Sequence, residues 1–202
     1  MIKRFIYALL LTAVLPLFTG CNSPEVFTEA MQLKKNEKIY TRFNIWYTDP
    51  KAISSMNYIS GKILPFGTEV DVASVNVSRI SCYSDVWEIA FNPVGSQTRY
   101  TVVFDEQMMM QDVQTYIKRL FTTQNREQLG KGISKEFLRD INRGRVVSGM
   151  NRDEVLLTYG FPPPPRTFSL KNDTWIYQEK QFDSKRIIFR GGKVRSCIDM
   201  EE

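Results

Sequence analysis

Alternation of apolar and polar residues through the middle of the chain is the feature that most constrains its fold. Between residues 39 and 105, short alternating runs are separated by turns rich in Pro, Gly and Asn. The clearest runs are 87–91 and 100–104, in which every second residue is apolar. Because successive side chains of a strand point to opposite faces, this pattern predicts half-buried strands. We therefore expect residues 39–105 to form a small antiparallel β barrel or sandwich.

Five aromatic residues gather near the start of this β region, and they have two interpretations. They can line a groove that binds a peptide, cell-wall material or a small ligand. They can equally fill the core of a small β domain, where aromatic rings supply much of the buried area. The five residues are Tyr40, Phe43, Trp46, Tyr47 and Tyr58.

A helix and a connector are expected over residues 106–133. Apolar residues recur at helical spacing at Met109, Val113, Tyr116 and Leu120, which predicts an amphipathic helix over 106–122 packed on the β region. Residues 122–133 are polar and contain two glycines, so they are interpreted as a connector and as the main domain boundary.

The remaining residues, 134–202, carry the signals of two helices followed by strands. Ser134 is a candidate N-cap for a helix over 135–142, and Asn151 with Glu154 three residues later predicts a capping box that opens a second helix. Gly160 is expected to end that helix. Strands are expected at 166–170, 174–179 and 186–189, and residues 194–198 extend the sheet or add a short strand. The whole chain is therefore expected to be α+β, with this part forming two helices on a three-stranded antiparallel sheet.

The first 20 residues have the layout of a secretory signal peptide. Lys3 and Arg4 precede an apolar run over 5–17, and Phe18, Thr19 and Gly20 lead to Cys21. The apolar run is shorter than the ~20 residues that a membrane-spanning helix needs, although an uncleaved anchor and an ordinary signal peptide remain alternatives. Residues 21–38 are polar and are expected to form a tether, with a short helix over 25–33 as the alternative.

The segment ending at Cys21 resembles the lipobox of bacterial lipoproteins. The resemblance implies that Cys21 is acylated and attaches the chain to a membrane, where several acyl chains give a stable anchor. Asn22, which follows the cysteine, implies the outer membrane of a Gram-negative bacterium, with the protein on its periplasmic face.

Two further resemblances concern the folded part. Residues 149–155, 159–162, 174–177, 187–189 and 192–194 resemble in order and spacing the SmpA/OmlA family, small outer-membrane lipoproteins of the β-barrel assembly machinery. Tyr159 stands where that family usually has leucine. Residues 61–70 are similar to the start of bacterial SH3-like domains. The SmpA/OmlA resemblance implies a scaffold or accessory role in the envelope with a protein partner. The residues matched to that family look structural.

Composition argues against catalysis. The chain has no histidine, which removes the commonest general base and metal ligand, and its cysteines lack metal-site spacing. We expect no cofactor, no metal and no enzymatic activity, the alternative being a hydrolase that uses distant carboxylates. Without residues 1–20 the net charge is +3, which is only mildly basic, and a nucleic-acid partner would call for a concentrated basic patch, so none is expected. Cys82 and Cys197 either form a disulfide in an oxidising compartment or remain buried thiols.

Overall fold

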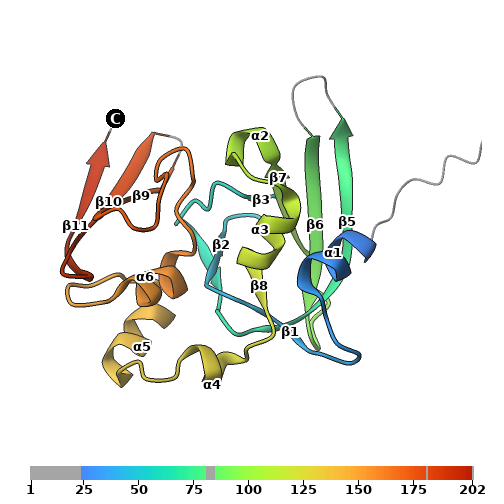
Figure 1. Ribbon diagram of the computed structural model, residues 1–202, viewed down its shortest axis with the longest axis horizontal. Coiled ribbons are helices and arrows are strands. Elements are labelled where there is room, and N and C mark those ends of the chain that lie inside the picture. The colour runs from blue at the N-terminus through green and yellow to red at the C-terminus, as the bar shows by residue number, and fades with distance from the viewer. Residues whose placement is uncertain (1–23, 81–84, 181, 202) are drawn as a thin grey trace, which may run out of the picture.

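The structure is a computed structural model that describes residues 24–80, 85–180 and 182–201 (Figure 1). The described residues form a mixed α+β fold. It contains a curled six-stranded sheet, a separate three-stranded sheet, a two-stranded ribbon and six helices. The expectation of an α+β chain is confirmed at this level.

The six-stranded sheet is built mainly from the region in which strands were expected. Its strand order is β3-β7-β6-β5-β1-β8, and all neighbours are antiparallel except the parallel pair β3–β7. The alternation seen in the sequence is real, because Ile89, Phe91, Val102 and Phe104 are fully buried. The strands are β1 (Ile39–Thr41), β3 (Ile53–Ser54), β5 (Glu69–Ile80), β6 (Asp85–Pro93), β7 (Tyr100–Asp105) and β8 (Phe121–Thr122).

Helix α1 (Pro24–Met31) lies within the residues expected to form a tether. Phe27 and Ala30 are three residues apart, so they share one helical face, and both are buried in the core of the six-stranded sheet. The ring of Phe27 meets that of Phe121 edge to face, with centroids 5.6 Å apart. The expectation of a solvated tether is therefore wrong for these eight residues, and the alternative of a short helix is the one observed.

The helix expected over 106–122 is two helices, α2 (Glu106–Met109) and α3 (Val113–Leu120). The chain breaks at Met110, which has a left-handed backbone (φ 50°), and restarts at Asp112, whose side chain caps α3 by accepting from the Thr115 N–H. The apolar stripe survives the break, since Met109, Val113 and Leu120 are all buried. The capping residues thus set where the helices begin and end, whereas the apolar residues of both helices are placed by their burial in the core.

The aromatic run that begins at Tyr40 also divides. Only β1 joins the large sheet, whereas β2 (Ile45–Tyr47) pairs with β4 (Lys62–Leu64) in a separate ribbon. The turn between β1 and β2 carries Arg42, Phe43 and Asn44, and the N–H of Asn44 donates to the carbonyl of Leu157 on α6 (2.9 Å).

The two capped helices of the C-terminal part are confirmed. Helix α5 (Lys135–Asn142) is capped by Ser134, and α6 (Arg152–Tyr159) opens with the expected capping box of Asn151 and Glu154. Gly160 ends α6 with a positive φ of 74°. The connector contains a further short helix, α4 (Arg126–Leu129), with its own capping box at Asn125.

The three-stranded sheet has the order β11-β10-β9 and is antiparallel throughout. Its strands are β9 (Thr174–Gln178), β10 (Asp183–Arg190) and β11 (Lys193–Glu201). The strand expected at 166–170 is not formed, because the N–H groups of Arg166 and Thr167 both turn back to the carbonyl of Pro163. The third strand is instead β11, which the sequence offered as an optional extension.

Both halves of the chain contribute to the second hydrophobic core. Trp175, Tyr177, Ile187 and Phe189 supply the sheet side of that core, and Ile59 and Phe66 enter it from the first half. The two halves are therefore packed into one body rather than linked only through residues 122–133.

Candidate functional site

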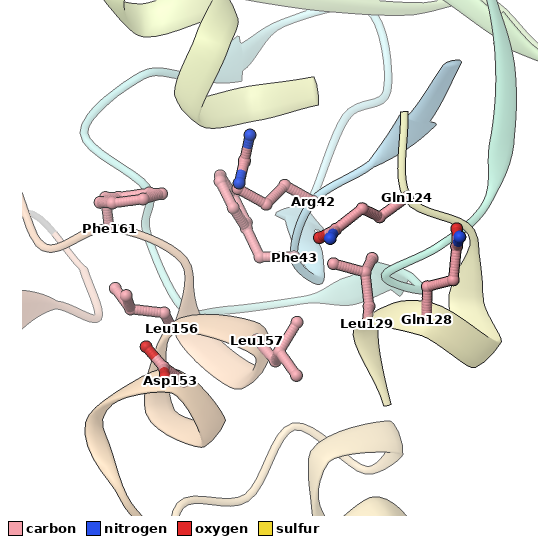
Figure 2. A pocket seen from close by; sticks show the side chains of 9 residues that line it. All are labelled: Arg42, Phe43, Gln124, Gln128, Leu129, Asp153, Leu156, Leu157 and Phe161. Atoms are coloured by element: carbon pink, nitrogen blue, oxygen red, sulfur yellow. The ribbon is translucent and has the colours of Figure 1, made fainter. Parts of the chain in front are cut away.

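A hollow of about 400 Å³ lies where the two halves of the chain meet. We call it the junction hollow. Its walls come from the β1–β2 turn, from α4 and Gln124 before it, and from α6 and Phe161, two residues after its end (Figure 2). The lining residues are Arg42, Phe43, Gln124, Gln128, Leu129, Asp153, Leu156, Leu157 and Phe161.

The floor of the hollow is apolar and its rim is polar. Figure 2 shows Leu129, Leu156 and Leu157 approaching the hollow from α4 and α6. Arg42 and Asp153 lie on opposite sides in the same view, and the amide of Gln124 points toward its middle. A few convergent polar groups around an apolar floor are typical of ligand-binding sites.

Arg42 is the cation of the site, and it is incompletely paired. Its Nη2 donates to the carbonyl of Phe121 (3.2 Å), while its buried Nε has no hydrogen-bond partner within the described residues. Burial lowers the pKa of the guanidinium below its usual value, although a guanidinium stays charged in proteins. A buried donor without a partner is costly, so Arg42 is held in place at some expense of stability.

A second arginine, on α3, contacts one of the rings that line the hollow. The guanidinium carbon of Arg119 lies 5.2 Å from the centroid of the Phe161 ring, in cation–π contact. Phe161 in turn meets Phe43 edge to face, with centroids 6.0 Å apart. The aromatic side of the hollow is therefore fixed from α3, from the β1–β2 turn and from the segment after α6.

Asn44 holds the two sides of the hollow in place. It is fully buried, its N–H donates to Leu157 O (2.9 Å), and its Nδ2 donates to Ile141 O (2.6 Å). Its Oδ1 accepts from the N–H of Phe66 (2.9 Å). Trp46 adds a bond from its Nε1 to Thr158 O (3.1 Å). The β1–β2 turn is thus tied to the ends of α5 and α6 by hydrogen bonds that fix the shape of the hollow.

The five aromatic residues of the expected groove do not act together. Phe43 and Tyr47 belong to the core of the six-stranded sheet, and Tyr47 meets Tyr100 edge to face. Trp46 packs on the other core and meets Tyr159 edge to face. Phe43 alone among the five lines the junction hollow. Core packing accounts for Phe43, Trp46 and Tyr47, whereas Tyr40 and Tyr58 are half-buried outside both cores.

The predicted lipidation site, Cys21, and one of the two remaining cysteines, Cys82, lie outside the described residues. Cys197 is on β11, where it is an exposed residue with a free thiol. Burial of its sulfur is the largest of the effects that raise the pKa of the Cys197 thiol, so the reactive thiolate is disfavoured. Acylation of Cys21 and the pairing of Cys82 with Cys197 stay predictions.

Sequence reasoning did not find the junction hollow. Its residues come from three separated segments, and no local pattern links Arg42 to Gln124 or Asp153. The one usable signal was an arginine in an aromatic and β-branched run, flanked by Thr41 and Phe43. Such a position is half-buried in most sheets, so a charged residue there marks a partner or a site.

Comparison with known proteins adds no assignment, because no protein-family model, curated protein or solved structure matches this chain. Within residues 24–80, 85–180 and 182–201, no group of three or more His, Cys, Asp or Glu residues is placed to hold a metal ion. The helices of the described part are all too short or too polar to cross a membrane. The chemistry that the hollow offers is recognition of an acceptor group beside an apolar one.

Proposed function

We propose that this protein is a lipid-anchored, non-catalytic lipoprotein of the cell envelope. It is held on the periplasmic face of the outer membrane through Cys21 and acts as a scaffold or accessory in outer-membrane assembly or maintenance. It binds a partner protein through the junction hollow, whose apolar floor receives a side chain and whose Arg42 receives a carbonyl or carboxylate of the partner.

Two local features support the placement in the envelope. The segment that ends at Cys21 has the charged start, the apolar run and the small residues of a lipoprotein signal. The part of the chain from α5 to β11 has the two helices and the antiparallel sheet expected for an SmpA/OmlA-like module. We propose that this module is SmpA/OmlA-like and that the strands before α2 form an SH3-like unit.

The junction hollow is the observation that carries the binding role. It combines an under-paired cation, an apolar floor and walls fixed by Asn44. A preformed site loses little conformational entropy on binding, which favours recognition by a rigid scaffold. The volume also lies in the usual range for small-ligand sites, roughly 300–1,000 Å³, so a peptide or small ligand is the second candidate occupant.

The anchor is tested by exchanging Cys21 for serine in the full chain and fractionating the cells. We expect the native protein in the membrane pellet and the Cys21→Ser protein in the soluble periplasmic fraction. Retention of the variant in the pellet at the native level, after washing with high salt, would contradict the anchor.

The binding role is tested by placing a photo-crosslinking amino acid at Gln124, whose exposed side chain lines the hollow, in living cells. The matched control is Gln97, an exposed glutamine in the β6–β7 loop. We expect a discrete crosslinked envelope protein from position 124 that is lost when Arg42→Gln is added. Equal crosslinking from both positions would contradict a partner at the hollow. A compound that protects position 124 without any protein crosslink would favour the small-ligand alternative.

A further inference from the structure

The two outer edges of the three-stranded sheet differ in how their backbone groups are used. On β9, the N–H of Ile176 donates to Thr167 Oγ1 (2.9 Å) and the carbonyl of Gln178 accepts from Ile59 (2.9 Å). That edge is therefore covered by other parts of the chain. Edge β11 is covered only at its start, where Val194 exchanges bonds with Met150 (2.7 Å) and Gly149 (2.9 Å).

The rest of β11 presents backbone groups that are ready to pair. The backbone groups of Ile176 and Gln178 point away from β10. The residues opposite them on β10, Arg186 and Ser184, therefore direct their own backbone groups to β11. These groups meet Ile198 and Met200. The backbone N–H and C=O groups of the intervening residues, Cys197 and Asp199, must then point away from β10, because these directions alternate from one residue to the next along a strand. Within the described residues, neither backbone has a hydrogen-bond partner on that side.

We propose that the open part of β11 is a docking edge for a second copy of this chain. The two β11 strands pair antiparallel about a two-fold axis at Ile198, which extends each three-stranded sheet into a six-stranded sheet across the dimer. Strand addition to an exposed edge is a general mode of recognition, and an open edge that is neither short nor blocked calls for a partner.

Charge selects a second copy as the occupant. The basic residues Lys193 and Arg195 lie in the first half of β11 and Asp199 lies in its second half. An antiparallel copy therefore brings the basic end of each strand toward the acidic end of the other, whereas a parallel copy would align like charges. The apolar residue Ile198, which is 44% exposed, comes to the centre of the pair.

The same constraints select the register. An axis at Asp199 would place two carboxylates directly opposite each other, which is unfavourable. An axis at Cys197 would set the partner's strand against Val194, whose outward groups already bond to Met150 and Gly149. An axis at Ile198 avoids the first problem and sets no described residue of the second strand against Val194. It pairs the outward-directed backbone groups of Cys197 in each strand with those of Asp199 in the other.

Single cysteines test this register in the full chain, with Cys21 retained and with Cys82 and Cys197 changed to serine. Ile198 of one copy opposes Ile198 of the other in a narrow pair, with Cα atoms about 4.5 Å apart, which is within disulfide range. Ile198→Cys should therefore form a reducible dimer on mild oxidation, several-fold more than Val94→Cys, an exposed control in the turn after β6.

Two neighbouring positions make the test specific. Ser196 should oppose Met200 of the second copy, so Ser196→Cys and Met200→Cys should crosslink weakly alone and strongly when the two variants are coexpressed. A backbone test follows from the same geometry, since Cys197→Pro removes only an outward N–H, a position where edge strands tolerate proline. In the Ile198→Cys chain, Cys197→Pro should reduce the dimer several-fold relative to Cys197→Ser while the melting temperature stays the same.

Three outcomes would overturn the proposal. They are dimer formation by Ile198→Cys no greater than by Val94→Cys, equal crosslinking by all three β11 cysteines, and crosslinking of Ile198→Cys to a different protein. The last outcome would assign the edge to another partner. None of these outcomes bears on the junction hollow, because the hollow lies on other elements.

Discussion

The side-chain amide of Asn44 donates to the carbonyl of Ile141 at 2.6 Å, joining residues 97 positions apart in the chain. The same side chain accepts from the N–H of Phe66 at 2.9 Å. One buried amide therefore satisfies a backbone group in each half of the chain. The arrangement makes the packing of the halves depend on a polar residue inside the body, where an unmade hydrogen bond is most costly.

Asn44→Ala should destabilise the protein strongly. The change leaves the Ile141 carbonyl and the Phe66 N–H buried without partners, at about 1–3 kcal/mol for each group, so we expect a total loss of about 2–6 kcal/mol. Chemical denaturation followed by fluorescence measures this loss. Asn92→Ala is the matched control, because the Asn92 amide bonds to Thr98 O at the surface (3.1 Å) and its loss should cost little. Similar losses for both variants would contradict the role given to Asn44.

Gly144→Ala should be poorly tolerated, because the position requires a positive φ of 66° and also close approach. A Cβ at this position would overlap the ring of Trp46. Gly132→Ala separates the two effects, since Gly132 has a φ of 82° but open space around it. We expect the control to lose about 1 kcal/mol from backbone strain and Gly144→Ala to lose clearly more. Thermal unfolding of the two variants side by side measures the difference, and equal losses would show that the contact with Trp46 does not matter.

Arg152→Ala should loosen the segment between α6 and β9. The guanidinium donates to Leu170 O (3.2 Å), Asn172 O (2.9 Å) and Asp173 Oδ1 (2.9 Å), and its carbon lies 4.4 Å from the Phe189 ring centroid. These contacts are partly exposed, so we expect a loss of only about 1–2 kcal/mol.

Limited proteolysis is the sharper measurement for this variant, because cleavage within residues 166–173 should accelerate before the rest of the protein is attacked. Lys171→Ala, an exposed change in the same segment, is the control. If both variants are cut at the native rate, Arg152 does not hold the segment.

Alkaline pH should destabilise the protein in part through Tyr159. Burial raises the pKa of Tyr159 to about 12, above the value of about 10 expected in the unfolded chain. A folded-state pKa above the unfolded value gives stability that is complete below about pH 10 and is lost as the pH rises through about 12.

The Tyr159→Phe variant has no group that ionises at this position. Between roughly pH 9 and pH 11.5, the free energy of unfolding should fall in both proteins, and the fall should be about 1–2 kcal/mol smaller in the variant than in the native chain. Denaturant unfolding at the two pH values measures both changes. An identical pH dependence would show that Tyr159 ionises as readily in the folded protein as in the unfolded one.

Local signals predicted the elements that are fixed locally. Ser134, Asn151 with Glu154, and Gly160 gave the bounds of α5 and α6 because a cap is decided within four residues of chain. The alternation over β6 and β7 was equally reliable, because each strand buries one face on the same core.

The expectations that failed depend on distant residues. The aromatic run from Tyr40 to Tyr47 divides because β1 pairs with β5 whereas β2 pairs with β4, and no property of the run shows the division. Phe27, which was expected to lie in a solvated tether, is buried because its ring packs on that of Phe121, far along the chain. The junction hollow shares this origin, since its lining is assembled only when the two halves pack.

Helix α1 begins at Pro24, three residues after the cysteine proposed to carry acyl chains. Three residues of extended chain reach at most about 11 Å, so an acylated Cys21 would keep the start of α1 within about that distance of the membrane surface. Figure 1 shows α1 toward one end of the long axis and the three-stranded sheet at the other. The end that carries α1 would therefore rest near the lipid head groups, while the three-stranded sheet would stand off from the bilayer and meet whatever approaches from the aqueous side.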